Sequence, residues 1–203
     1  MRIAVLGTGA IGGALGGLLA RAGHQVVLGS RHPEQVAPAG GPTVKVASVQ
    51  DAIGVGDVVI EALPFKATMA LPASPLTGKI LISASNFYAP RDGELKLNAS
   101  SQTEALANRL PGARVVEAFN MMFAEEMQAR LVDPSLALLA IFMAGDDAGA
   151  KQAAAELIRD AGFDPIDTGG LAAGRLFETG APLYAQRWSA QEARRHLAAV
   201  QKT

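Results

Sequence analysis

The chain has 203 residues, 49% of them hydrophobic, and a formal net charge of −1. This length suits one domain, or one domain with a small added lobe, and the near-neutral charge argues against nucleic acid as a partner. The absence of cysteine excludes disulfides, thiolate catalysis and cysteine metal sites. No apolar run reaches the roughly eighteen residues of a membrane span, and the chain opens on a strand rather than a signal peptide. We therefore expect a cytoplasmic protein with no metal and no membrane contact.

The first thirty residues carry the clearest local pattern. Residues 1–6 form a short apolar run with β-branched side chains, which is typical of a buried parallel strand. A helix over 13–22 and a second strand over 25–28 are predicted further on. Between the first strand and the helix stands a Gly-x-Gly-x-x-Gly motif, which in this context predicts a dinucleotide-binding site. Its residues are Gly7, Thr8, Gly9, Ala10, Ile11 and Gly12.

Each glycine of this motif has its own expected role. Gly7 permits the tight turn out of the strand, Gly9 lets a pyrophosphate approach the backbone, and Gly12 lets the helix lie close to the sheet. The helix then directs its unpaired N–H groups and the positive end of its dipole at the phosphates. A glycine-rich turn that only packs a helix on a strand is the alternative, and the flanking strand and helix favour dinucleotide binding over it.

The end of the second predicted strand indicates which dinucleotide binds. NAD-binding proteins usually place Asp or Glu here to bond the ribose hydroxyls. This chain instead has Gly29, Ser30, Arg31 and His32. A hydroxyl and a guanidinium can bind a 2′-phosphate, and His32 can assist them. A solvated arginine after a strand is common, but the missing acid and the added cation together predict NADPH.

The rest of the chain alternates between strands and helices. After a loop over 32–42 with at most one helical turn, further strands are predicted over 44–46, 57–63, 79–83, 114–119, 136–144 and 163–167. Residues 84–93 are predicted to be a loop. Helices are predicted over 48–53, 66–71, 101–110, 121–131, 171–178 and 183–200, with another that is capped by Asp146 and Asp147 and ends near residue 160.

This order predicts a Rossmann-type, doubly wound α/β fold with a mainly parallel sheet of about eight strands and a small C-terminal helical lobe. We expect a dinucleotide-binding domain over 1–145 and a βα extension with the helical lobe over 146–203, packed on the same sheet. Met122, Phe123, Met127 and Leu131 fall at helical spacing, and such a stripe is more often core than a flavin-binding surface. The apolar residues of 183–200 form no clean stripe, so part of that surface is a candidate homodimer contact.

The predicted site lies where the carboxyl ends of the strands meet. Two loops there can frame a nicotinamide and its ribose. The first holds Leu63, Pro64 and Phe65, and the second runs over 84–88. Phe65 could wall the site, and an amide at Asn86 or Asn120 could bond the carboxamide or a ribose hydroxyl. For each aromatic taken alone, ordinary packing is the better interpretation. Because the candidates converge on one edge of the sheet, a role in binding and a role in packing become about equally good interpretations.

Candidate acids and bases are nearly absent from this edge. His24, His32 and His196 fall elsewhere, and the chain has no Tyr-x-x-x-Lys pair. Because reduction of a carbonyl needs a proton donor, the sequence argues against an alcohol or hydroxy-acid dehydrogenase. Hydride transfer to a flavin-like ring mainly needs two stacked rings and exclusion of water. We therefore assign no catalytic side chain from the sequence.

Together these motifs resemble the NADPH-dependent reductases of the deazaflavin coenzyme F420, and related domains that pass hydride from NADPH to a flavin. The resemblance is carried by residues 7–13, 22–31, 63–65, 85–88, 111–120 and 144–147. Many relatives have Asn-Pro-Tyr where this chain has Asn86, Phe87 and Tyr88, so its acceptor loop is expected to differ in shape.

The resemblance also implies roles for individual residues. Thr8 to Ile11 would hold the pyrophosphate, and Ser30 with Arg31 the 2′-phosphate. The nicotinamide half would lie against residues of two loops, namely Leu63, Pro64, Ala84 and Asn86. The acceptor ring, from coenzyme F420, FMN or FAD, would lie near Phe119, Asn120 and the C-terminal lobe.

Two other functions remain open at this point. An imine reductase related to pyrroline-5-carboxylate reductase would share the N-terminal half, but that family usually adds a longer helical dimer domain. A non-catalytic NADPH-binding sensor would equally lack acid and base residues. An open cleft wide enough for a tricyclic ring would favour the reductase, and a sealed one the sensor.

Overall fold

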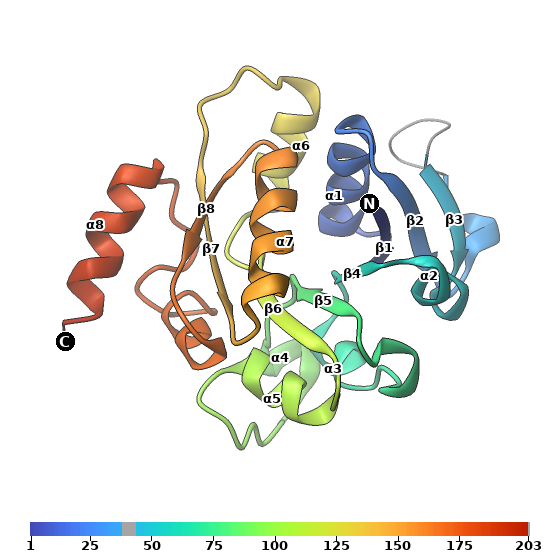
Figure 1. Ribbon diagram of the computed structural model, residues 1–203, viewed down its shortest axis with the longest axis horizontal. Helices are drawn as coiled ribbons and strands as arrows, with labels where there is room; N and C mark the ends of the chain where they lie inside the picture. The colour runs from blue at the N-terminus through green and yellow to red at the C-terminus, as the bar shows by residue number, and fades with distance from the viewer. Residues whose placement is uncertain (38–43, 203) are drawn as a thin grey trace.

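A computed structural model describes residues 1–37 and 44–202 of the chain. Within these residues, eight strands form one sheet in the order β3-β2-β1-β4-β5-β6-β7-β8 (Figure 1). Neighbouring strands are parallel except for β6 and β7. This topology confirms the predicted Rossmann-type, mainly parallel sheet. The strands are β1 (Arg2–Leu6), β2 (Gln25–Ser30), β3 (Val44–Ser48), β4 (Val58–Glu61), β5 (Ile80–Ser83), β6 (Arg114–Ala118), β7 (Ala140–Gly145) and β8 (Asp164–Asp167).

Helices cover both faces of the sheet, as the alternating sequence pattern predicts. Helices α1, α6 and α7 pack together on one face, α2 and α5 lie on the other, and α8 packs on the edge strand β8. The α-helices are α1 (Ala10–Arg21), α2 (Val49–Val55), α3 (Phe65–Thr68), α4 (Ala89–Asp92), α5 (Gln102–Arg109), α6 (Ala124–Val132), α7 (Ala148–Asp160) and α8 (Ala190–Val200). Shorter 3-10 segments are η1 (Pro33–Gln35), η2 (Ser74–Leu76) and η3 (Leu171–Leu176).

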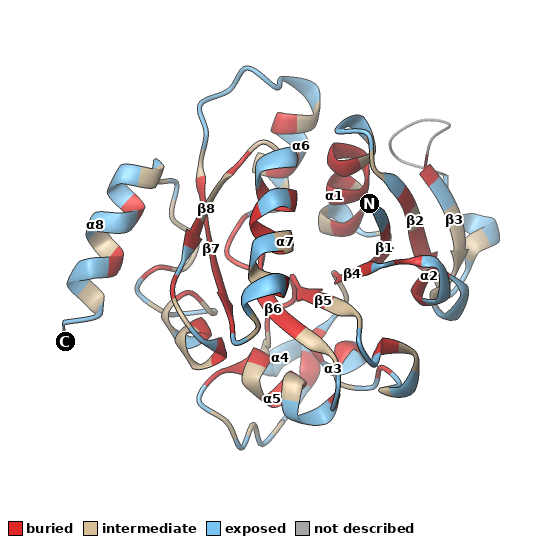
Figure 2. Cartoon of the chain, viewed as in Figure 1, coloured by how far each residue is buried: buried red, intermediate tan, exposed pale blue. Residues whose placement is uncertain are grey.

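Alternate residues of the central strand feed two separate apolar cores. Ile3 and Val5 belong to the cluster under α1, α6 and α7, whereas Ala4 and Leu6 belong to the cluster under α2 and α5. Side chains alternate across a strand, so a continuous apolar run such as β1 serves both faces. The strands are mostly buried while the outer faces of the helices are exposed (Figure 2). No helix in the described residues is both long and apolar enough to cross a membrane.

The predicted strand over 136–144 starts late, at Ala140. The buried guanidinium of Arg130 explains the difference because it donates to the carbonyl oxygens of Leu136 and Ala137, at 2.6 Å each. Carbonyls held by this cation are not free to join a strand ladder. Residues 136–139 therefore form an irregular approach to β7.

The predicted C-terminal helices are also shorter than expected. The helix over 183–200 begins only at Ala190, where Ser189 and Glu192 form a capping box. The carbonyl of Trp188 accepts from the Ala140 N–H at 2.8 Å, so residue 188 lies beside the start of β7 and outside the helix. Residues 171–178 hold a 3-10 segment rather than an α-helix. The division of the chain at residue 145 stays a prediction, since one sheet runs across it.

Smaller differences lie around the other helices. The predicted helix over 66–71 is the single turn α3, and the predicted loop over 84–93 contains α4. Asp147 caps α7 by accepting from the Ala150 N–H at 2.7 Å, but Asp146 accepts from the Leu171 N–H instead. Of the loop predicted over 32–42, η1 supplies the one turn, and residues 38–42 lie outside the described residues.

Candidate functional site

The glycine turn between β1 and α1 has a geometry that only glycine can supply at two positions. Gly7 has a φ of +102°, in the left-handed region, and its N–H donates to the Gly29 carbonyl at 3.0 Å. A Cβ at Gly12 would lie 2.1 Å from the Gly7 carbonyl oxygen. The sequence predicts only that Gly12 brings α1 near the sheet. In the structure Gly12 also packs directly against the Gly7 carbonyl of the turn.

Gly9 has a different role. It is the N-cap of α1, with φ −73° and ψ −170°, a conformation open to any residue, and a Cβ there would meet nothing within 4 Å. No side chain caps the helix, and its first turn holds no acidic residue. The first N–H groups of α1 therefore have no side-chain partner, and the positive end of the helix dipole lies next to the open space at Gly9. This is a ready place for a phosphate anion.

The cationic segment after β2 lies beside this turn, because β1 and β2 are parallel and Leu6 pairs with Gly29. The Ser30 hydroxyl accepts from the His32 N–H at 3.1 Å, and the His32 ring approaches Glu34 at 3.7 Å. Within the described residues, the Arg31 guanidinium has neither a hydrogen-bond nor an ion-pair partner. An exposed, unpaired guanidinium next to the turn fits the predicted 2′-phosphate site.

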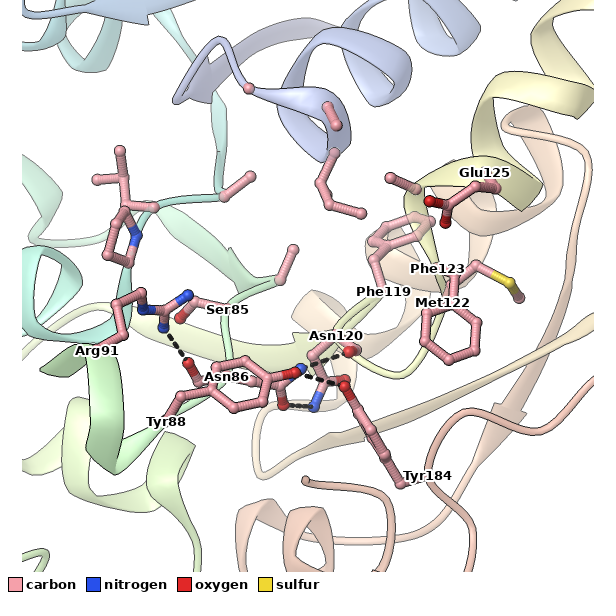
Figure 3. A pocket seen from close by; sticks show the side chains of 18 residues that line it. Ser85, Asn86, Tyr88, Arg91, Phe119, Asn120, Met122, Phe123, Glu125 and Tyr184 are labelled. Atoms are coloured by element: carbon pink, nitrogen blue, oxygen red, sulfur yellow. Dashed lines mark hydrogen bonds between the residues drawn. The ribbon is translucent and has the colours of Figure 1, made fainter. Parts of the chain in front are cut away.

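A cavity of about 450 Å³ joins the glycine turn to the ends of β4, β5 and β6 (Figure 3). This volume is in the usual range for small-molecule sites. The structure brings nine residues singled out in the sequence to this cavity: Gly9, Ala10, Ile11, Leu63, Pro64, Ala84, Asn86, Phe119 and Asn120. The other candidates lie outside its lining: Gly7, Thr8, Gly12, Ser30, Arg31, His32 and Phe65.

Two aromatic predictions need correction. Phe65 is completely buried and packs edge-on against Phe87, with ring centroids 6.1 Å apart, so its ring does not wall the cavity. Phe123 was grouped with a core stripe, and Met127 of that stripe is indeed buried. Phe123 itself is 44% exposed and lines the cavity beside Met122. The exposed phenylalanine at the cavity is thus Phe123 at the start of α6 rather than Phe65 of α3.

A buried carboxyl at the end of β4 ties the two cavity loops together. Glu61 accepts from the Ser85 hydroxyl at 2.9 Å, from the Thr68 hydroxyl at 2.6 Å and from the Ser83 hydroxyl. It also accepts from the Leu63 N–H at 3.4 Å. Burial raises its pKa to about 7, against these hydrogen bonds, which lower it. Glu61 therefore holds the loops after β4 and β5 in register beneath the cavity.

A second buried carboxyl supports the two asparagines. The Asn120 amide donates to Glu117 at 2.8 Å and to the Asn86 side-chain oxygen at 3.2 Å. The Asn86 amide donates in turn to the Asn120 carbonyl at 2.6 Å, and the Gln102 amide donates to Glu117 at 3.1 Å. Burial is the main cause that raises the pKa of Glu117, and the charge of Glu178 is the second; together they raise it to about 8. The amides at the cavity floor are therefore fixed in orientation before any ligand arrives.

The raised pKa of Glu117 predicts a pH-dependent stability. Its folded-state pKa lies above the usual 4.5, so stability from the protonated carboxyl is full below about pH 4.5 and is lost as the pH rises toward 8. We expect Glu117→Gln, which keeps an accepting oxygen, to remove a slope of up to about 1.4 kcal/mol per pH unit. Urea unfolding at pH 5 and pH 8 measures it. Glu94→Gln, at an exposed site, should keep the wild-type slope, and the same slope in both variants would contradict the assignment.

The structure also brings to the cavity residues that sequence reasoning missed. Tyr88 and Tyr184 both line it, with their hydroxyls 2.6 Å apart, so two phenols that the sequence did not single out as acids stand at this edge. Arg91 lies over the Tyr88 ring and Glu125 lines the opposite wall. Tyr88 stands in a loop already singled out, but nothing local marks Tyr184.

None of the three histidines lines the cavity. His24 bonds Asp160 at 2.9 Å, His196 stacks on Trp188, and His32 is the exposed residue after β2. Among residues 1–37 and 44–202, no group of three His, Asp or Glu side chains could hold a metal ion.

Comparisons with known proteins agree on one family. Residues 2–87 match the family model described as NADP oxidoreductase, coenzyme F420-dependent. The F420-dependent NADP reductase of Methanothermobacter thermautotrophicus is 32% identical over 207 residues, covering 90% of this chain and 87% of that protein. A solved structure of a hypothetical protein from Sinorhizobium meliloti is 32% identical, with a TM-score of 0.79, covering 93% of this chain and 95% of that one.

Part of a larger protein is also similar. Metalloreductase STEAP3 of Rattus norvegicus is 32% identical over 179 residues, which cover 87% of this chain and 36% of that protein. The chain thus spans about a third of the length of this metalloreductase.

Proposed function

Because this chain belongs to the family of coenzyme F420-dependent NADP oxidoreductases, we propose that it transfers hydride between NADPH and a deazaflavin or flavin. The chain is an NADP-dependent oxidoreductase by its family, and the identity of its acceptor is the proposal. Direct transfer from one ring to another depends on their alignment at close range, and the enclosing cavity serves that purpose.

The residues present fit the NADP(H) nucleotide. The uncapped start of α1 and the open space at Gly9 suit the pyrophosphate, and the unpaired guanidinium of Arg31 with the Ser30 hydroxyl suits the 2′-phosphate. His32 is assigned to the same phosphate. NADPH supplies the hydride when bound. Pro64 and Asn86 would hold its nicotinamide half, together with Leu63 and Ala84.

One observation carries the proposal: a single cavity runs from the glycine turn to the aromatic surface at the start of α6. A nicotinamide placed against the loops after β4 and β5 would face Phe119 and Phe123 across this space. The exposed Phe123 ring offers a face on which a planar acceptor can stack. The cavity leaves room for an acceptor beside the nicotinamide, which favours a reductase over a non-catalytic sensor with a closed site.

The relatives suggest one more acceptor class. The name of the similar metalloreductases raises a metal chelate as an acceptor for this chain too, and ferric citrate is a convenient probe of that class. An imine remains the alternative from the sequence, and the tyrosine pair in the cavity is a proton donor that imine reduction would require.

The test is oxidation of NADPH in the presence of coenzyme F420, FMN, FAD, ferric citrate and pyrroline-5-carboxylate in turn, with NADH as the control donor. We expect NADPH-selective turnover with the deazaflavin or a flavin. Turnover with only the ferric chelate or only the imine would replace the proposed acceptor. Tight NADPH binding with no turnover in any arm would instead make the protein a binding module.

A further inference from the structure

We propose that Tyr88 is the acid that protonates the reduced acceptor, and that Tyr184 positions the Tyr88 hydroxyl for this step. This inference rests on the proposed function, because a proton is needed only if hydride reaches an acceptor in this cavity. It gives the site a catalytic side chain, which the sequence did not provide.

The two hydroxyls meet at one end of the cavity. Tyr88 follows β5, Tyr184 comes from the segment between η3 and α8, and their oxygens are 2.6 Å apart. Figure 3 shows this contact beside the side chains of Asn86 and Asn120. Each phenol is partly buried and lines the cavity. One O–H of the pair is used between the two residues, which leaves the other free to point at a ligand.

The backbone is strained on both sides of this pair. Among the described residues, Phe119 (φ 68°) and Ala185 (φ 56°) are the non-glycine residues with a positive φ. Phe119 lines the cavity, and Ala185 directly follows Tyr184. Strained residues of this kind persist where the surrounding structure holds them, and they gather at functional sites. Both residues stand next to groups of the cavity, since Phe119 precedes Asn120 and Ala185 follows Tyr184.

The surroundings decide which tyrosine gives up its proton. The Arg91 guanidinium lies 5.0 Å from the centre of the Tyr88 ring and is held there by the Asn86 carbonyl, at 2.6 Å, and by Asp92. The Tyr88 ring therefore carries a cation over its face, and within the described residues the Tyr184 ring has no such contact. Burial raises the pKa of Tyr184 to about 12, so Tyr184 keeps its proton and can donate it as a hydrogen bond to the phenolate.

Three charged groups face the pair. Arg91 is a cation, whereas Asp92 and Glu125 are carboxyl groups. Asp92 is ionised, since the Arg91 guanidinium holds the pKa of its carboxyl at about 2, and the ion pair between them offsets the two charges against each other. Glu125 lies on the far wall of the cavity, on α6 (Figure 3).

The step balances without any further reagent. The hydride brings two electrons and one hydrogen to the acceptor ring, which then carries a negative charge. The Tyr88 O–H bond breaks, its proton goes to the ring, and its electron pair stays on the phenolic oxygen. A proton from water restores Tyr88 after the product leaves.

The first experiment reads the tyrosines without relying on activity. Tyr88 and Tyr184 are the two tyrosines of the chain, so the absorbance of tyrosinate near 295 nm reports this pair directly. We expect two well-separated tyrosine ionisation steps in the wild type. Tyr184→Phe should show a single step, at a higher pH than the first step of the wild type. Two tyrosines that ionise together near pH 10, as independent phenols do, would overturn the proposal.

The second experiment measures kcat/KM against pH with whichever acceptor the wild type reduces. Tyr88→Phe should lose about 100-fold in kcat/KM and the alkaline limb of the profile, while its Kd for NADPH stays the same. Tyr184→Phe should lose less and shift the alkaline limb to higher pH. Wild-type activity and profile in Tyr88→Phe would refute the acid role alone. If the wild type reduces no acceptor, the proposed function fails first, and this inference fails with it.

Discussion

A Gly9→Ala variant should fold like the wild type and yet bind NADPH at least about ten-fold more weakly. Its Cβ meets nothing within 4 Å, and the backbone at Gly9 is in an extended conformation that alanine adopts freely. The same Cβ would occupy the space through which a pyrophosphate approaches the N–H groups of α1. Thermal unfolding and calorimetric titration with NADPH together separate folding from binding.

Two other glycines provide the controls. Gly54→Ala, also with open space around its Cβ and located in α2, should leave NADPH affinity unchanged. Gly12→Ala should fail at folding instead, because its Cβ would lie 2.1 Å from the Gly7 carbonyl oxygen. If Gly9→Ala bound NADPH as the wild type does, the phosphates would have to lie elsewhere.

An Arg31→Ala variant should bind NADPH about 10- to 100-fold more weakly and NADH almost unchanged. The guanidinium has no partner among the described residues, so its removal leaves no buried group unpaired and should not alter stability. Hydrogen bonds to a charged phosphate contribute about 1.5–3 kcal/mol, which corresponds to that range of affinities. The measurement is the ratio of the two dissociation constants.

Two further variants sharpen this test. Arg31→Lys keeps the charge but loses the two-pronged donor geometry, so an intermediate affinity is expected. Arg109→Ala, at an exposed position at the end of α5, should bind both nucleotides normally. Equal losses for NADPH and NADH in Arg31→Ala would remove Arg31 from the 2′-phosphate site.

The parts of the site that could be predicted are those specified by neighbouring residues. The turn from Gly7 to Gly12 and the cation at Arg31 depend on short motifs between a strand and a helix, which fix their place in the fold. The eight strands were likewise readable from their apolar runs, although β7 starts late because Arg130 binds the carbonyls before it. Tertiary contacts of this kind leave no local pattern.

The remaining parts depend on residues that meet only in the folded chain. Tyr184 contacts Tyr88, which is 96 residues away in sequence. Phe65 is buried by packing against Phe87, a contact that no local pattern marks. The sequence does carry a signal for the two buried carboxyls, because Glu61 and Glu117 each interrupt an apolar strand near its carboxyl end. An isolated carboxyl in such a strand must find hydrogen-bond partners, so it marks a polar network at that edge of the sheet.

The reversal of direction between β6 and β7 has a consequence for the order in which the site assembles. Because β7 and β8 run opposite to the other strands, the segment after β8 must travel back along the sheet before Tyr184 reaches the cavity. The glycine turn, in contrast, closes through contacts between adjacent strands. Loop closure makes distant contacts slower to form than near ones. A nascent chain should therefore form the glycine turn early and the contact between Tyr88 and Tyr184 last.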